Sequence, residues 1–210
     1  MNNYFKNKTK AEVLFDLGKK KLQFIVPKTF FFTVGDWQSK KEIIIENIIT
    51  KFRSFNVNFL AIRSSAMEED NENLSNAGKF TSELKIPLKK DKLVLSINRI
   101  IKSYKKIKKK NSYLKNQILI QEMITNTSMS GVIFTKDRDT GANYYSINYD
   151  DITGLTNTVT SGSGEYSNKT LFIYRKRIHS IFHFGEFSRI YQSFKKFDEC
   201  FDSNSIGSKA

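Results

Sequence analysis

The order of the apolar patterns along the chain constrains its fold more than any other feature of the sequence. In the first half, segments with apolar residues at helical spacing alternate with short apolar runs that are typical of strands. In the second half, strand-like runs follow one another, separated by Gly, Asp and Asn turns. Because a doubly wound sheet needs helices between its strands throughout, this order favours an α+β fold of two lobes.

The individual patterns give approximate bounds for each element. Helical spacing of apolar residues predicts helices over 9–21, 39–52 and 91–104. Thr9 and Ser39 are candidate N-caps, because their hydroxyls can accept from free N–H groups of a first turn. The strand-like runs cover 25–33, 57–63, 82–88, 117–124, 131–135, 143–150 and 170–176. Residues 178–210 carry a weaker pattern, which we interpret as a divergent helical segment and a tail.

Size and composition exclude several classes of protein. With 39% hydrophobic residues, the 210-residue chain can bury a core in one domain or in two small lobes. No apolar run approaches the roughly 20 residues that a membrane span needs, and the first residues lack the apolar segment of a signal peptide. We therefore expect no membrane partner and a cytoplasmic location. The single Cys200 excludes an intrachain disulfide.

A net charge of +14 raises the question of nucleic-acid binding. Much of this excess is local, since residues 102–115 contain seven lysines. No zinc-ligand spacing, RNA-recognition signature or alternation of aromatic and basic residues accompanies them. We interpret the lysines as the solvated end of a helix and its loop, and keep nucleic-acid binding as a less favoured alternative.

The segment after the apolar run 57–63 carries the residue types that a phosphate-handling site needs. Such a site uses fixed cations, small hydroxyls, backbone N–H groups reached through glycine, and carboxylates where magnesium is held. The segment supplies Arg63, Ser64, Ser65, Glu68, Glu69, Asp70 and Gly78. Arg63 is the most informative, because a charge at the end of an apolar strand needs a partner. No P-loop pattern occurs in the sequence.

These residues resemble the signature of the nucleotide-binding domain of phosphoenolpyruvate synthase and pyruvate phosphate dikinase, an ATP-grasp domain. In that family a strand ends in Arg-Ser-Ser-Ala, a Glu-Asp pair follows, and an Ala-Gly pair precedes the next strand. The corresponding positions are Arg63, Ser64, Ser65, Ala66, Glu69, Asp70, Ala77 and Gly78. Residues 9–33 are similar to the family's N-terminal segment, and 118–141 to its hinge strand and Ser-Gly-Val-x-Phe-Thr-x-Asp segment.

The resemblance implies a fold, a cofactor and a set of site residues. Residues 1–177 would form part of an ATP-grasp-like, two-lobed nucleotide-binding domain. Lys10 and Arg63 would contact the phosphates of ATP, and Arg63 would also be catalytic. Gly78 would allow close approach of the backbone, Ser82 stands where the family usually has threonine, and Gln121 and Glu122 would read adenine. Mg²⁺ is expected as a second cofactor, but no metal ligand is assigned.

Each assignment has a simpler alternative. Lys10 could be an ordinary solvated lysine, and Gln121 could pair at a strand edge. Glu68, Glu69 and Asp70 are more typical of an exposed acidic turn than of metal ligands. His179 and His183 lie outside any ligand motif, and we interpret them as packing or surface residues.

Two departures from the family shape the functional expectation. The family's late Gln-x-Arg-Pro segment and its phosphohistidine context have no counterpart in the sequence. We therefore expect an ATP-grasp domain incomplete at its C-terminal side, inactive alone and dependent on a separate phosphohistidine domain for phosphotransfer. The loop 150–170 is similar to the glutamine-kinase branch of capsule biosynthesis, so the acceptor is either pyruvate-like or the amide of L-glutamine. A remnant that binds nucleotide or regulates without catalysis is the alternative.

Overall fold

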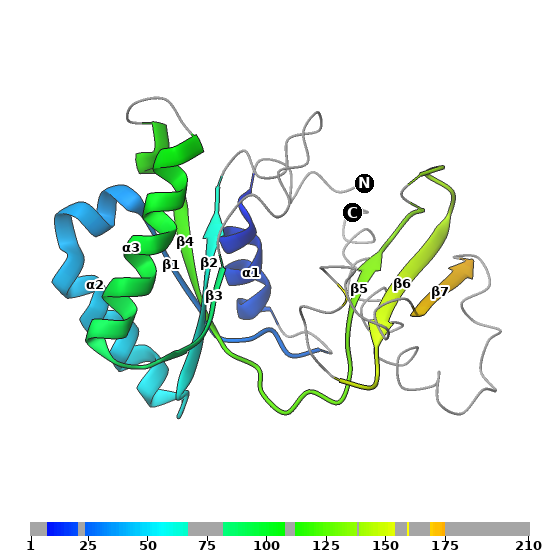
Figure 1. Cartoon of the computed structure of the whole chain (residues 1–210), viewed down its shortest axis with the longest axis horizontal. Helices are drawn as coiled ribbons and strands as arrows, with labels where there is room; N and C mark the ends of the chain where they lie inside the picture. The colour runs from blue at the N-terminus through cyan, green and yellow to red at the C-terminus, as the bar shows by residue number, and fades with distance from the viewer. Residues whose placement is uncertain are drawn as a thin grey trace, which may run out of the picture. The chain divides into compact units, whose positions relative to one another are not determined.

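The computed structural model describes residues 8–20, 24–66, 82–107, 112–137, 139–153, 159 and 169–174. The chain divides into two compact units, Met1–Met123 and Ile124–Ala210. Within the described residues, the first unit contains three α-helices and a four-stranded sheet, and the second contains a three-stranded sheet (Figure 1). This is the mixed α+β composition that the sequence predicts.

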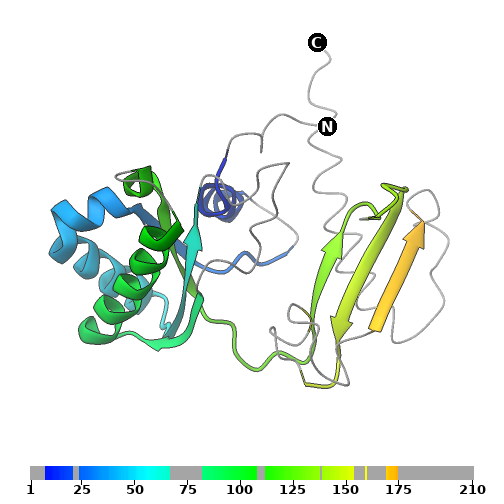
Figure 2. The same ribbon diagram turned by 45° about the horizontal axis from the view of Figure 1, so that its top comes forward.

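The sheet of the first unit has the strand order β1-β4-β2-β3, and every neighbouring pair is antiparallel. Its strands are β1 (Thr29–Thr33), β2 (Phe59–Ser65), β3 (Ser82–Pro87) and β4 (Gln117–Glu122). The long helices α2 (Val34–Ser54) and α3 (Lys90–Ile107) cover one face, and α1 (Lys10–Lys19) lies on the other (Figures 1 and 2). A 3₁₀ helix, η2 (Ser112–Lys115), leads into β4.

The main core lies between the sheet and the pair α2 and α3. Apolar residues at helical spacing on both helices meet alternate residues of the strands, as the periodicity requires. The core includes Ile44, Ile45, Ile48, Phe52, Leu60, Ile62, Leu93, Ile97, Ile100, Ile101, Tyr104, Ile118 and Ile120. The helical spacing of residues 91–104 predicts that Leu93, Ile97, Ile100, Ile101 and Tyr104 face inward, and all five are buried, so this prediction is confirmed.

The first two helices begin at capping boxes, one of which the sequence interpretation missed. Thr9 caps α1, as predicted, and its Oγ1 accepts from the Glu12 N–H at 3.2 Å. The predicted start of α2 at Ser39 is wrong, because Thr33 is the N-cap and its Oγ1 accepts from the Asp36 N–H at 3.0 Å. The backbone of Lys40 departs from helical angles, with φ −134° and ψ 32°. The regular apolar pattern therefore begins only after this kink.

The capping box of α2 gives a pH-dependent prediction. Hydrogen bonds from Thr33 lower the pKa of Asp36 below its ordinary value. A lowered carboxyl pKa stabilises the fold above the unfolded pKa, and this contribution is lost as the pH falls through the folded pKa. Asp36→Ala removes the N3 acceptor of the box and should lower the free energy of unfolding by about 1 kcal/mol at neutral pH, as for a lost hydrogen bond. Below the folded pKa the deficit should shrink. Urea unfolding at several pH values measures this difference in the free energy of unfolding. Glu46→Ala, at an exposed position of the same helix, is the control.

The second unit is built on the antiparallel sheet β5-β6-β7, formed by β5 (Ser130–Phe134), β6 (Tyr144–Asp150) and β7 (Lys169–Tyr174). Tyr145, Ile147 and Ile173 form its small buried cluster. Gly131 lies opposite Tyr149, and a Cβ at this position would meet the carbonyl oxygen of Asn148 at 2.8 Å. Close packing against β6 therefore favours glycine at this position of the Ser-Gly-Val segment.

The loop that joins β5 to β6 is organised by Asp137, the last residue of the Thr-x-Asp segment. Its Oδ1 accepts from the backbone N–H of Asp139 at 3.2 Å and of Thr140 at 2.8 Å. Gly141 follows in the left-handed region, at φ 69°, where glycine is favoured. These contacts show a turn-forming role for Asp137 in the described structure.

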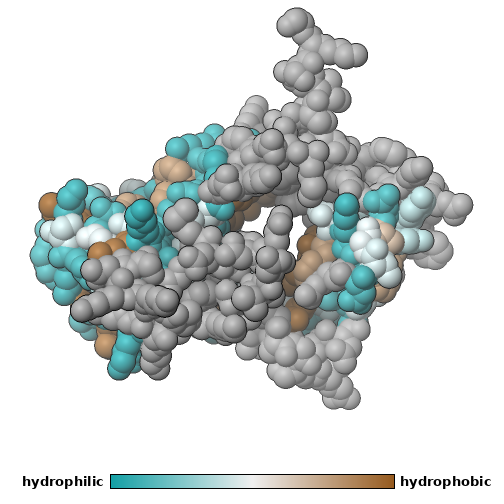
Figure 3. All heavy atoms as spheres, turned by 90° about the horizontal axis from the view of Figure 1, so that it is seen from above, coloured by the Kyte–Doolittle hydropathy of each residue, from teal (hydrophilic) through white to brown (hydrophobic). Residues whose placement is uncertain are grey.

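The surface of the described residues is mixed in character. Where the face drawn in Figure 3 is coloured, hydrophilic and apolar residues are interspersed. Exposed apolar side chains among the described residues include Ile25, Ile43 and Phe172. None of the described helices has the length and the hydropathy that crossing a membrane requires. The first lysines of the run 102–115 lie in α3, and Lys102 is exposed. The helical segment expected after residue 178 lies outside the described residues.

Candidate functional site

The register of the sheet decides which candidate residues share a face. Residues directly opposite one another on neighbouring strands point to the same side of a sheet. One cross-strand row consists of Phe31, Leu119, Arg63 and Ser82, and the next consists of Thr29, Gln121 and Ala61. Arg63, Ser82 and Gln121 therefore lie on one face. Glu122 pairs with Leu60, whose side chain belongs to the core under α2 and α3, so Glu122 lies on the opposite face.

Helix α1 lies on the face that carries Arg63. The ring of Phe15 in α1 packs edge-on against Phe31 of β1, with centroids 5.4 Å apart. The backbone N–H of Ala11 donates to Ser65 Oγ at 3.0 Å. Lys10, which precedes Ala11, is exposed at the first position of the helix. The start of α1 is therefore attached beside the end of β2, two residues beyond Arg63, so the first turn that bears Lys10 and the strand that bears Arg63 meet.

Arg63 combines a charge with an incompletely satisfied environment. Its side chain is partly buried, and its Nε has no hydrogen-bond partner in the part of the chain that the structure describes. Burial lowers the pKa of the guanidinium from its ordinary value, because removal from water disfavours the charged form. Among the described residues no ion pair to Arg63 is present, and a partly buried cation that lacks a counter-charge is costly. This position is therefore suited to an anionic ligand.

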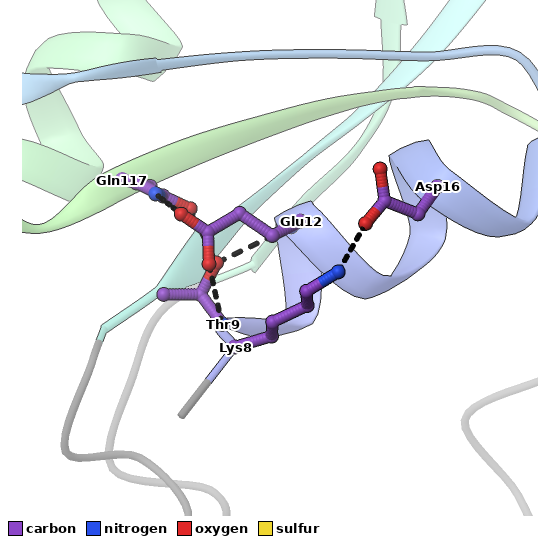
Figure 4. A network of polar contacts seen from close by, with 5 residues as sticks. All are labelled: Lys8, Thr9, Glu12, Asp16 and Gln117. Atoms are coloured by element: carbon purple, nitrogen blue, oxygen red, sulfur yellow. Dashed lines mark hydrogen bonds and ion pairs between the residues drawn. The ribbon is translucent and has the colours of Figure 1, made fainter. Parts of the chain in front are cut away.

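A buried polar network fixes the start of α1, and its central member, Gln117, was missed by the sequence interpretation. Thr9 Oγ1 donates to Gln117 Oε1 at 2.5 Å, and Gln117 Nε2 donates to Glu12 Oε1 at 2.9 Å (Figure 4). Glu12 Oε2 accepts from the Thr9 N–H at 2.9 Å. Gln117 opens an apolar strand, and a polar residue entering a buried strand needs partners, which is the signal that could have identified it.

Tyr104 joins the two strands beneath this network. Its hydroxyl donates to the Gln117 carbonyl oxygen at 2.6 Å and accepts from the Ser65 N–H at 2.8 Å. On the solvent side, Lys8 Nζ forms an ion pair with Asp16 Oδ2 at 2.6 Å, across the first turns of α1 (Figure 4). The end of β2, the start of β4 and the start of α1 are therefore tied together.

The two candidates at the end of β4 differ in their environment. The side chain of Gln121 makes no hydrogen bond within the described residues and lies on the α1 face. Glu122 is engaged with the residue before β1, because its Oε2 accepts from the Lys28 N–H at 3.2 Å and its N–H donates to the Lys28 carbonyl at 2.9 Å. Gln121 is therefore the better placed of the two to meet a ligand on the Arg63 face.

The predicted residues that follow β2 lie only partly within the described residues. Gly78 and the acids Glu68, Glu69 and Asp70 lie outside the described residues. Ser82, the first residue after that gap, is exposed opposite Arg63. Across the described ranges, no three His, Cys, Asp or Glu side chains gather in a group that could hold a metal ion.

One comparison with known proteins identifies a family. The family model described as "Pyruvate phosphate dikinase, AMP/ATP-binding domain" matches residues 36–181, which is most of the chain. This range includes Arg63, Ser82 and Gln121 and begins after Lys10. A comparison with curated proteins gives no match.

Proposed function

The chain belongs to the family of pyruvate phosphate dikinase AMP/ATP-binding domains, and we propose that it binds ATP on the α1 face of its first sheet. In this proposal Arg63 and Lys10 contact the phosphates, Ser82 lies beside Arg63, and Gln121 contacts the base. Gly78 keeps its sequence-based role as a point of close backbone approach. The bound ATP would supply a phosphoryl group for transfer.

The observation that carries the proposal is the buried, unpartnered Nε of Arg63 within the described residues. A guanidinium presents several N–H donors in a planar fork that matches phosphate oxygens, and it stays charged at physiological pH. An anionic phosphate would supply both the acceptor and the counter-charge that the described residues do not give to Arg63. Ser82, directly across the strand pair, adds a hydroxyl beside the same position.

The position of Lys10 at the start of α1 supports its proposed contact with the phosphates. It lies at the first position of α1, where the backbone N–H groups of the first turn carry partial positive charge. Its neighbour Ala11 is hydrogen bonded to the strand that carries Arg63. A phosphate chain beside this junction would meet a lysine from α1 and an arginine from β2, and both would oppose the charge that develops during transfer.

Gln121 extends the proposed site along β4. Side-chain amides can both donate and accept, which suits the edge of an adenine ring. The Glu122 carboxylate, in contrast, already accepts from the Lys28 N–H, so its sequence-based role in adenine binding requires a rearrangement. Mg²⁺ remains an expectation from the family, and the described residues offer no group of ligands for it.

The acceptor is the least constrained part of the proposal. We expect the phosphoryl group to pass to a histidine on a separate domain or chain, and then to a pyruvate-like acceptor or to the amide of L-glutamine. The glutamine option rests on the loop 150–170, most of which lies outside the described residues. The ATP-grasp two-lobed fold, cytoplasmic location and role in capsule biosynthesis likewise remain predictions from the sequence.

A titration of ATP into the purified chain, followed by calorimetry, tests the proposal. Binding should be detectable, and Lys10→Ala should weaken it roughly tenfold or more, because a charge-assisted hydrogen bond contributes about 1.5–3 kcal/mol. Lys19→Ala removes an exposed lysine from the other end of the same helix and should change little.

Three other outcomes would contradict the proposal. A stably folded chain that does not bind ATP would favour a remnant without nucleotide-binding function. Equal losses for Lys10→Ala and Lys19→Ala would indicate general charge attraction. Salt-sensitive binding of RNA or DNA together with no binding of ATP would favour the alternative based on the lysine run 102–115.

A further inference from the structure

We infer that Gln117 and Ser65 are positioning residues of this site, which hold Lys10 at a fixed place relative to Arg63. The inference rests on the proposed function, because it assigns a role to residues that surround the proposed phosphate contacts. Neither side chain has a role in binding ATP in the proposal above. Both are buried, with 6% of Gln117 and none of Ser65 exposed.

Lys10 is held through both of its neighbours in the chain. On one side, Thr9 donates its hydroxyl hydrogen to Gln117 Oε1. On the other, Ala11 donates its backbone N–H to Ser65 Oγ. The two anchoring side chains come from different strands, β4 and β2, and are directly opposite one another in the sheet. The backbone of Lys10 therefore lies between two anchors and has little freedom to move along the sheet.

The direction of each hydrogen bond fixes the orientation of the Gln117 amide. The Thr9 hydroxyl has one hydrogen, which it gives to Gln117, and its oxygen accepts from the Glu12 N–H. Because the Glu12 carboxylate only accepts, the amide nitrogen faces it, and the amide oxygen then faces the Thr9 hydroxyl. Glu12 completes the cycle by accepting from the Thr9 N–H. In this cycle each donated hydrogen meets an acceptor, and a fully satisfied polar network of this kind is rigid.

The same strands connect the network to the proposed ligand contacts. Ser65 is two residues beyond Arg63 on β2, or about 7 Å along a strand. Gln117 is four residues before Gln121 on β4, or about 13 Å. The Tyr104 hydroxyl holds these strand ends together through the Ser65 N–H and the Gln117 carbonyl oxygen. A displacement of the Gln117 side chain should therefore move Lys10 while Arg63 stays in place.

Gln117→Glu is the most informative substitution, because it preserves shape and inverts one contact. The new carboxylate would replace an N–H donor that lies 2.9 Å from Glu12 Oε1. Two carboxylates at this distance repel unless they share a proton, so the first turn of α1 should shift at high pH and return as the pair takes up a proton. Around this position, α3 contributes the Tyr104 hydroxyl, and β1 and β2 contribute the uncharged Thr33 and Ser65. The charged groups nearest to it along these elements are Lys10 in the first turn of α1, Asp36, which accepts from Thr33, and the pair formed by Lys8, just before α1, and Asp16.

The test measures ATP affinity by calorimetry for the wild type, Gln117→Glu, Lys10→Ala and the double variant, each compared with the wild type at the same pH. At about pH 8, Gln117→Glu should weaken ATP binding roughly tenfold, and most of this loss should disappear near pH 5.5. In the Lys10→Ala background, Gln117→Glu should have no further effect. Gln38→Glu makes the same chemical change at an exposed position of α2 and should leave affinity unchanged.

Ser65→Ala provides a second variant that adds no charge, for use if Gln117→Glu does not fold. The loss of ATP affinity caused by Ser65→Ala should also vanish in the Lys10→Ala background. Unlike the loss caused by Gln117→Glu, it should not depend on pH. Additive losses in either double variant, or a pH-independent loss for Gln117→Glu, would overturn the positioning role. If the wild type binds ATP but Lys10→Ala has no effect, Lys10 does not contact the ligand. The positioning role then fails because Lys10 has no role in binding, which differs from an additive loss in a double variant.

Discussion

Arg63→Ala should weaken ATP binding roughly 100-fold, the largest loss expected from any single substitution, because truncating one member of a buried charged hydrogen-bonded contact costs about 2–5 kcal/mol. We expect a loss of this size because the guanidinium is partly buried and its Nε is buried. Arg63→Lys should recover only part of the affinity, since an ammonium cannot reproduce the planar fork of donors. Calorimetric titration with ATP measures both variants.

The stability of an Arg63→Met variant separates a ligand-binding role of Arg63 from a structural one. Because the Arg63 Nε has no partner within the described residues, replacing the arginine with Met should leave the free energy of unfolding unchanged or raise it. Arg53→Ala, at an exposed position of α2, is the matched control for loss of charge. A destabilised Arg63→Met variant, or an Arg63→Ala variant with normal ATP affinity, would show that Arg63 serves the fold instead.

Tyr104→Ala should cause the largest loss of stability, about 5 kcal/mol. Removing a fully buried aromatic ring costs about 3–5 kcal/mol, and the Ser65 N–H and the Gln117 carbonyl oxygen would lose their partner as well. A loss of this size can equal the whole stability of a small domain. Urea unfolding followed by the helical circular dichroism signal measures this loss, because α1, α2 and α3 all lie in the first unit.

Tyr104→Phe separates the hydroxyl from the ring. It keeps the packing and removes only the two hydrogen bonds, so the expected loss is about 1–3 kcal/mol. Tyr144→Phe, at an exposed position in the second unit, should change stability by less than about 0.5 kcal/mol. Equal stabilities of Tyr104→Phe and the wild type would contradict the view that this hydroxyl ties β2 to β4.

Elements with a regular apolar period were predictable from the sequence, and the exceptions have local causes. The predicted helix 91–104 lies within α3, because Leu93, Ile97 and Ile100 mark one continuous buried face. The start of α2 was not predictable from the period, because the kink at Lys40 separates its first turns from the regular pattern. The Thr33 and Asp36 pair at the spacing of a capping box was the available signal.

The candidate site was predictable in part. The types and order of residues around Arg63 pointed to phosphate chemistry, and the family match covers that segment. Strand alternation alone could have shown that Gln121 and Glu122 face opposite sides of β4. The partnership of Gln117 with Thr9 could not be read from the sequence, because the two residues are 108 positions apart and meet only where the start of α1 packs on the sheet.

The central claim is that ATP binds on the α1 face of the first sheet, and mapping backbone amide chemical shifts by NMR during an ATP titration tests it most directly. The account predicts that the largest shifts fall in the first turn of α1, at Arg63 to Ser65 of β2 and around Gln121 of β4. Shifts confined to the α2 and α3 face or to the lysine run 102–115, or a saturating concentration of ATP that shifts nothing, would contradict it.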